Sequence, residues 1–108
     1  MKRFVFLYYG FETPTPEIMA AWGNWFESMK DNIVDMGHFV GGRKISKAGT
    51  KDLPLGLESI TGFTIMSADS LDDAEKMAQS NPYISSIRVY ERNSSTWSDC
   101  LIAASMST

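Results

Sequence analysis

The feature that most constrains this chain is a short run near its start, Arg3-Phe-Val-Phe-Leu-Tyr-Tyr9, in which every residue after the arginine is apolar or aromatic. A run rich in β-branched and aromatic side chains, and too short for a helix, predicts a β-strand. Because side chains alternate along a strand, the even-numbered and odd-numbered residues point to opposite faces. Both faces are apolar, so the fold has to cover this strand on two sides.

A long amphipathic helix is predicted after this strand. Thr15 can cap it, Pro16 suits the first helical position, and Glu17 complements the positive end of the helix. Apolar residues then recur in steps of three and four: Ile18, Trp22, Trp25, Met29, Ile33 and Met36. This spacing indicates one buried face over about six turns, with Gly37 as the C-terminal stop.

The rest of the chain predicts three more strands and one more helix. The strands are expected at 38–46, 61–67 and 84–92, and a long loop is expected at 47–59. Ser70 is expected to cap the second helix, and Asn81-Pro82 to end it. Long loops in small domains often form lids or binding loops.

This order of elements, strand–helix–strand–strand–helix–strand, predicts an α+β fold of the ferredoxin-like βαββαβ type, with both helices on one face of the sheet. The other face is expected to carry Thr64, Met66 and Tyr90 together with half of the first strand. An exposed apolar patch of this size is uncommon on a monomer. We therefore expect a homodimer in which two sheets face each other.

Composition narrows the classes of function. The 108 residues suffice for one domain and carry a net charge of −3, with only 10 scattered Lys and Arg residues. A basic patch for nucleic acid or a membrane surface is therefore not expected. The lone Cys100 excludes an intrachain disulfide, the single His and scattered acids predict no metal site, and no cofactor motif is present. We expect a cytoplasmic protein.

Several stretches of the sequence resemble the YCII-related family, whose members form dimeric α+β barrels. These stretches are 4–10, 37–42, 60–66 and 68–75, followed by Asn81-Pro82. The resemblance covers 1–92 and implies a dimeric α+β barrel domain there. It leaves 93–108 as a C-terminal tail that is flexible or docks on the partner subunit.

The resemblance also suggests a pair of residues for acid–base chemistry. Most family members are uncharacterised, a few resemble enzymes of aromatic-ring degradation, and a His–Asp pair has been proposed as catalytic for some. The matching candidates here are His38 and Asp35, although His38 lies beyond the first helix. Histidine is the side chain that titrates near neutrality and can act as a general base. The alternative is a partly exposed histidine at the start of a strand.

Other side chains are candidates for binding a ligand. Trp22, Trp25 and Phe26 could line an apolar pocket between helix and sheet, or form the core face of the helix. Tyr8 could offer a hydroxyl group or lie at the edge of the core. Arg43 could hold an anion by a bidentate contact or be an exposed strand residue.

Two functions from different classes follow. The first is a dimer that binds or converts a small aromatic or lactone-like anion in a pocket between helix and sheet, roofed by the 47–59 loop. The second is a non-catalytic module that acts through dimerisation or partner binding. The sequence leaves open whether the protein is an enzyme.

Overall fold

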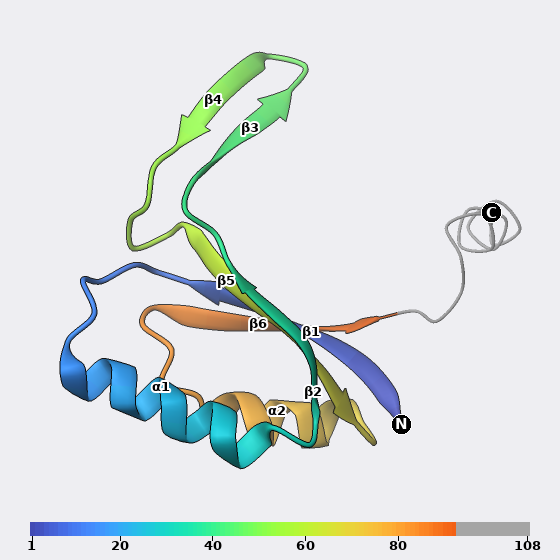
Figure 1. The fold of residues 1–108 in the computed structure, drawn as a ribbon. Coiled ribbons are helices and arrows are strands. Elements are labelled where there is room, and N and C mark those ends of the chain that lie inside the picture. The colour runs from blue at the N-terminus through green and yellow to red at the C-terminus, as the bar shows by residue number, and fades with distance from the viewer. Residues whose placement is uncertain (93–108) are drawn as a thin grey trace, which may run out of the picture.

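The computed structural model describes residues 1–92, and the predicted tail at 93–108 lies outside the described residues. The helices and strands are, in chain order, β1 (Lys2–Tyr9), α1 (Pro16–Met29), β2 (Ile33–His38), β3 (Gly42–Ser46), β4 (Gly49–Leu53), β5 (Ile60–Ala68), α2 (Leu71–Gln79) and β6 (Ser86–Arg92). Four strands form an antiparallel sheet in the order β2-β5-β1-β6. Both helices cover one face of this sheet, and the β3–β4 hairpin projects on the side of the opposite face (Figure 1). The ferredoxin-like α+β fold is therefore confirmed.

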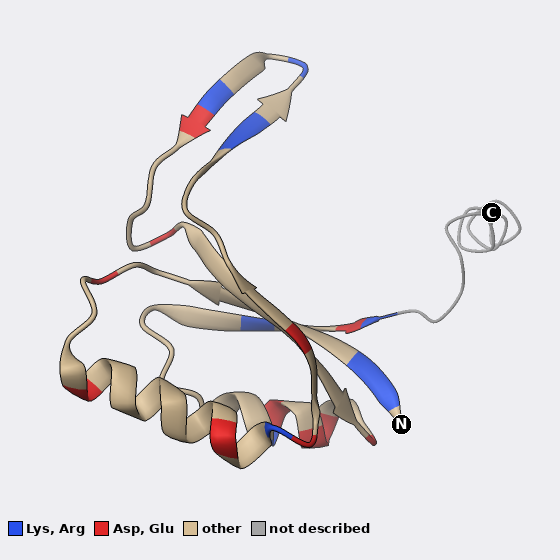
Figure 2. Cartoon of the chain, viewed as in Figure 1, with Lys and Arg blue, Asp and Glu red and all other residues tan. Residues whose placement is uncertain are grey.

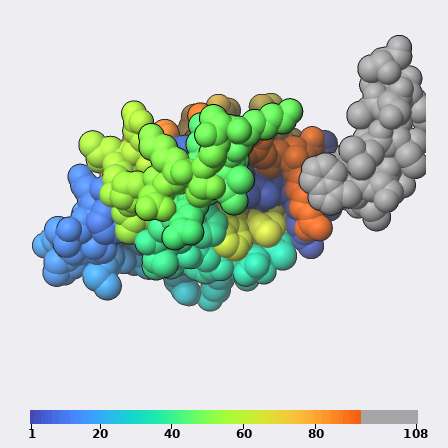
Figure 3. All heavy atoms as spheres, turned by 90° about the horizontal axis from the view of Figure 1, so that it is seen from above, coloured from blue at the N-terminus to red at the C-terminus, as the bar shows by residue number. Residues whose placement is uncertain are grey.

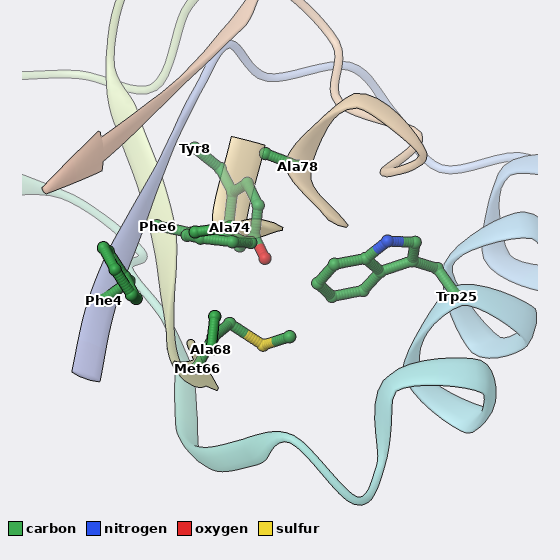
Figure 4. Packing of buried hydrophobic residues seen from close by; sticks show 8 residues of the cluster. All are labelled: Phe4, Phe6, Tyr8, Trp25, Met66, Ala68, Ala74 and Ala78. Carbon is green, nitrogen blue, oxygen red and sulfur yellow. The ribbon is translucent and has the colours of Figure 1, made fainter. Parts of the chain in front are cut away.

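The central strand β1 alternates between the two faces as predicted. Phe4, Phe6 and Tyr8 are buried against the helices, where they meet Met66, Ala68, Ala74, Ala78 and Trp25 (Figure 4). The odd-numbered residues of β1 lie on the opposite face, which we call the open face, and Val5, Leu7 and Tyr9 are partly exposed there.

The prediction that α1 continues to Met36 is wrong. The helix ends at Met29, and Ile33–His38 instead forms β2, the strand that pairs with β5. The chain changes direction between α1 and β2 at Asn32. The backbone N–H of Asn32 donates to the carbonyl oxygen of Met29, and its side-chain Nδ2 donates to the carbonyl oxygen of Ser67 at 2.9 Å. Ile33 and Met36 fit the helical spacing, but the segment pairs with β5, because this pairing satisfies backbone hydrogen-bonding groups of both strands.

The predictions for 38–46 and 47–59 also need correction. The second strand of the sheet ends at His38, and the next residues form a separate hairpin in which Arg43 pairs with Asp52 and Ser46 with Gly49. Gly49 has φ +130°, a backbone conformation that residues other than glycine rarely adopt. The expected loop therefore contains β4, and only the turn at 47–48 and the segment 54–59 lie outside a strand.

The second half of the domain follows the prediction closely. Ser70 caps α2, and its hydroxyl oxygen accepts a hydrogen bond from the Asp73 N–H at 3.2 Å. The helix ends at Gln79, just before Asn81-Pro82, and β6 follows.

Two residues expected on the open face lie in the core instead. Thr64 pairs with Phe6 and Met66 with Phe4, so both point toward the helices, and both are fully buried. The open face carries their neighbours Phe63 and Ile65, because side chains alternate along β5. Tyr90 lies on the open face as predicted, opposite Val5.

Trp25 ties the two helices together. It is 4 % exposed, and its indole N–H donates to the carbonyl oxygen of Met77 at 3.2 Å and the hydroxyl of Ser80 at 3.1 Å. Its ring also packs near Phe6, with the ring centroids 6.4 Å apart. One side chain thus joins α1, α2 and the sheet.

We expect Trp25→Ala to lower the free energy of unfolding by about 3–5 kcal/mol, because it removes a large buried ring and leaves a cavity. Trp25→Phe keeps a six-membered ring in the core but loses the pyrrole ring of the indole and its hydrogen bonds, so its destabilisation should be smaller than that of the alanine variant. Urea denaturation of the two variants and the parent measures both. An alanine variant as stable as the parent would contradict the role given to Trp25.

Candidate functional site

A cavity of about 710 Å³ lies between the hairpin and the adjacent end of the sheet. We call it the hairpin cavity. It is lined by Tyr9 and Phe39, by 41–43 and 51–55, and by 58–60. In Figure 3, which looks down on the open face, the green hairpin rises toward the viewer beside the strands of the sheet. The cavity therefore lies on the side of the sheet opposite to the helices.

Hydrogen bonds between the ends of neighbouring strands fix the backbone on the sheet side of this cavity. The Gly10 N–H donates to the carbonyl oxygen of Ser59 at 2.9 Å, and the Phe39 N–H donates to that of Thr61 at 2.9 Å. The Thr61 hydroxyl also donates to the carbonyl oxygen of Gly10 at 3.1 Å. These bonds join the C-terminal ends of β1 and β2 to the start of β5. The aromatic rings of Tyr9 and Phe39 are therefore attached to a fixed backbone.

Aromatic stacking orients Phe39. Its ring stacks on Phe63, with centroids 5.7 Å apart and an interplanar angle of 25°. Phe63 in turn leans over Gly37, where a Cβ atom would come within 2.6 Å of its ring. A side chain at position 37 would push Phe63 away, so this glycine lets the stacked pair lie flat on the open face.

The charged side chains of the cavity come mainly from the hairpin. Arg43 Nε lies 3.1 Å from Asp52 Oδ1 across the two strands, and both side chains are largely exposed. Lys51 and Glu58 also line the cavity. An exposed ion pair contributes little, about 0–1 kcal/mol, so Arg43 can exchange this contact for a ligand anion at small cost.

The other predicted binding residues lie on the helix side of the sheet. Trp22 contacts Tyr8 edge to face at a centroid distance of 5.0 Å, and Phe26 lies 5.6 Å from Trp22 and 5.4 Å from Trp25. These rings pack on one another and on the core. The structure brings Tyr8, Trp22, Trp25 and Phe26 together as a cluster, and it places Arg43 on the opposite side of the sheet.

Tyr8 belongs to a small buried polar group within that cluster. Its hydroxyl oxygen lies 2.6 Å from Thr64 Oγ1, and Asn81 is buried nearby. Burial raises the pKa of Tyr8 from 10.0 to about 12, although the hydrogen bond with Thr64 and the nearby side chain of Asn81 oppose this shift. The phenol is therefore neutral at physiological pH and is used in packing.

This pKa predicts a loss of stability at alkaline pH. Between pH 10 and about 12 the unfolded chain ionises Tyr8 while the folded chain does not, so the free energy of unfolding falls across this window. Tyr8→Phe removes that titration, so the stability difference between parent and variant should shrink as the pH rises through the window. Denaturant unfolding at several pH values measures it. The exposed Tyr83→Phe is the matched control, and a parallel decline in parent and Tyr8→Phe would contradict the assignment.

The structure does not bring Asp35 and His38 together. Both lie in β2, where Asp35 pairs with Ile65 and His38 with Gly62, so their side chains point to opposite faces of the sheet. Asp35 instead accepts a hydrogen bond from the Met36 N–H at 2.9 Å. Both side chains are exposed. The proximity that a general base and its orienting carboxylate require is missing.

Sequence reasoning missed Tyr9 and Phe39 as cavity residues. Tyr9 carried a usable signal, because the alternation of β1 places it opposite the buried Tyr8. Phe39 carried none, since the sequence predicts a continuous strand there and the structure has an irregular link between β2 and β3.

The fold and the cavity define an α+β protein with one uncovered sheet face and a side cavity. Among residues 1–92, no helix is long and apolar enough to cross a bilayer. Within the same residues, no group of three or more His, Cys, Asp or Glu side chains is placed to hold a metal ion.

Comparison with solved structures supports this class. The chain is similar to 5-chloro-2-hydroxyhydroquinone dehydrochlorinase (TftG) from Burkholderia phenoliruptrix AC1100, in its complex with 2,5-dihydroxybenzoquinone, with a TM-score of 0.55 and 19% identity over 84% of this chain and 93% of that one. A weaker likeness, with a TM-score of 0.44 and 11% identity over 98% of this chain and 96% of that one, is to 30S ribosomal protein S6 from Thermotoga maritima. No family model and no curated protein matches the sequence. The likeness to the dehydrochlorinase shows the fold.

Proposed function

We propose that this chain is a homodimeric small-molecule-binding protein of the YCII-like dimeric α+β barrel kind, with a small aromatic anion as its ligand in the hairpin cavity. The observation that carries the proposal is the cavity itself, in which aromatic rings and an arginine face one space. Ligand sites are mostly apolar with a few placed polar groups, and their volumes are commonly about 300–1,000 Å³.

The chemistry of the lining favours a flat anionic ligand. Tyr9 and Phe39 contribute aromatic surface to the lining, and Arg43 contributes a planar guanidinium group whose remaining N–H donors match a carboxylate or enolate. Asp52 already occupies Nε of this group at 3.1 Å, which shows that an oxygen anion fits beside it. The similar fold of the dehydrochlorinase, solved with a quinone bound, supports an aromatic ligand as the first class to test.

The open face supports the homodimer. Phe63, Ile65, Val5 and Leu7 are only partly covered in the single chain, and they form a continuous apolar strip across the two central strands. A strip of this kind on a small domain marks an interaction surface. A second copy covers it with the same residues, as isologous interfaces do.

A non-catalytic dimeric interaction module is the second candidate. It is favoured by the separation of Asp35 and His38 on opposite faces of β2, which removes the acid–base pair that the resemblance implied. The two candidates differ in whether the hairpin cavity is ever occupied.

Ligand binding can be tested with benzoate and 2,5-dihydroxybenzoquinone as probes and with neutral benzamide as the uncharged control. We expect amide NMR signals of Tyr9, Phe39 and the hairpin to shift on titration with the two anionic probes and much less with benzamide. Arg43→Gln should weaken binding of the anions about tenfold, equal to about 1.4 kcal/mol. Lys44→Gln, at the neighbouring position of β3 and outside the cavity lining, is the matched control.

Three results would contradict this site. One is the absence of shifts at millimolar probe concentration, which favours the interaction module. Another is equal weakening by both substitutions. The third is tryptophan quenching that Trp22→Phe abolishes, which would place the ligand on the helix side of the sheet.

Light scattering tests the homodimer separately. We expect a mass of twice the 12.1 kDa chain at micromolar concentration. Ile65→Lys, in the middle of the open face, should give the monomer mass, because a charge there would be desolvated without a partner. Met19→Lys, at a 65 % exposed position of α1, should leave the dimer intact. A parent chain that is monomeric under these conditions would overturn the dimer.

A further inference from the structure

The charged side chains of the open face are unevenly distributed. Strand pairing places Asp35 on this face at one edge of the sheet, in β2, and Arg88 and Arg92 on it at the other edge, in β6. Arg3 lies on the same face in β1, beside Arg92. Figure 2 shows an acidic position on β2 and basic positions on β6. Among the strand residues that the structure describes, Asp35 is the one acid on this face.

Arg88 is held flat on the open face. Its guanidinium carbon lies 4.9 Å from the centre of the Tyr9 ring, and its Nη1 donates to the Tyr90 hydroxyl at 3.4 Å. The group is therefore positioned in advance among aromatic side chains. When a second copy covers this face, the guanidinium loses contact with water, and a buried charge is strongly unfavourable without an anionic partner.

No acid of the same sheet face can serve as that partner. Asp35 and Arg88 stand on the two outer strands, with β5 and β1 between them. Neighbouring strands are about 4.8 Å apart, so the two backbones are separated by about 14 Å. An ion pair between Asp35 and Arg88 of one chain is therefore excluded by the width of the sheet, so Asp35 can reach an Arg88 only on another copy.

The symmetry of a dimer decides which residues meet. Two copies that face each other through the same sheet surface are related by a two-fold axis lying between the sheets. If that axis runs across the strands, each edge meets its own copy, and the arginines of the two β6 strands face one another. If it runs along the strands, β2 of one copy lies over β6 of the other, and opposite charges meet.

We infer that two copies of this chain pair about an axis parallel to their strands, with Asp35 of each copy bound to Arg88 of the partner subunit; this inference rests on the homodimer proposed above. Asp35 shares a row with Ile65, Val5 and Tyr90 across the sheet. Rotation about an axis along the strands leaves the position of this row along the strand direction unchanged. Asp35 therefore lies opposite Tyr90 of the partner subunit. Arg88 is two residues farther along the same face, about 7 Å away, within reach of the long arginine side chain.

The same arrangement gives the hairpin a neighbour. The hairpin continues from β2 and stands on the open-face side of the sheet (Figure 1), and all ten of its strand residues are exposed in the single chain. An isolated two-stranded hairpin is only marginally stable. With β6 of the partner lying over β2, the hairpin packs beside the partner subunit and the hairpin cavity lies at the subunit boundary.

Charge reversal tests the inference. Asp35→Arg and Arg88→Asp each place like charges at two symmetric contacts, so each should raise the dimer dissociation constant at least about tenfold, as measured by analytical ultracentrifugation. The double variant Asp35→Arg/Arg88→Asp restores both pairs and should dimerise about as tightly as the parent. The two single variants mixed in equal amounts should form a heterodimer, because each then meets its complement. Salt weakens the effect of each single reversal through screening.

Asp31→Arg, in the exposed connection between α1 and β2, is the matched control and should leave the dimer unchanged. Circular dichroism of each variant establishes that the monomer is folded. Failure of both the double variant and the mixture to recover dimerisation overturns the pairing. Tighter dimerisation of Arg88→Asp alone points to the axis across the strands and also overturns it. In both cases the parent chain remains a dimer, whereas a monomeric parent contradicts the proposed function itself.

Discussion

The structure depends on the pairing of β1 with two neighbours at once. This strand is hydrogen-bonded to β5 on one side and to β6 on the other, and its even-numbered side chains form much of the core. Because β1 is central, its alternation sets the faces of the strands beside it. Phe6 determines that Thr64 and Val89 point toward the helices, and Leu7 determines that Phe63 and Arg88 point away.

This arrangement gives the two faces of the sheet different roles. The helix face is filled by aromatic rings and closed by the indole hydrogen bonds of Trp25, so it serves stability. The open face carries an apolar strip, a positioned guanidinium and the hairpin cavity, so it is the face on which recognition is proposed. Of the two tryptophans that suggested a ligand pocket, Trp25 is buried in the core and Trp22 is partly buried against it, whereas the smaller rings of Tyr9 and Phe39 line the hairpin cavity.

Most elements could be predicted, since their signals are local. The caps at Thr15 and Ser70 and the alternation of β1 act within a few residues, and all are present in the structure. The errors occurred where a distant partner decided the outcome. Ile33 and Met36 fit a helix by spacing but pair with β5, and the face occupied by Thr64 and Met66 depends on a register with β1 that local pattern does not contain. The prediction of the site was affected most, because Asp35 and His38 are near in sequence but lie on opposite faces of the sheet.

The sequence by itself determined the order of the main strands and helices and the apolar character of both faces of β1. These properties follow from composition and short-range periodicity, which do not depend on contacts with residues distant in the sequence. Only the tertiary structure decided where α1 ends, that 42–53 folds as a hairpin beside a cavity, and that Asp35 and Arg88 of the open face stand at opposite edges. These features depend on strand pairing between distant residues, and pairing is set by the backbone hydrogen bonds of the whole sheet.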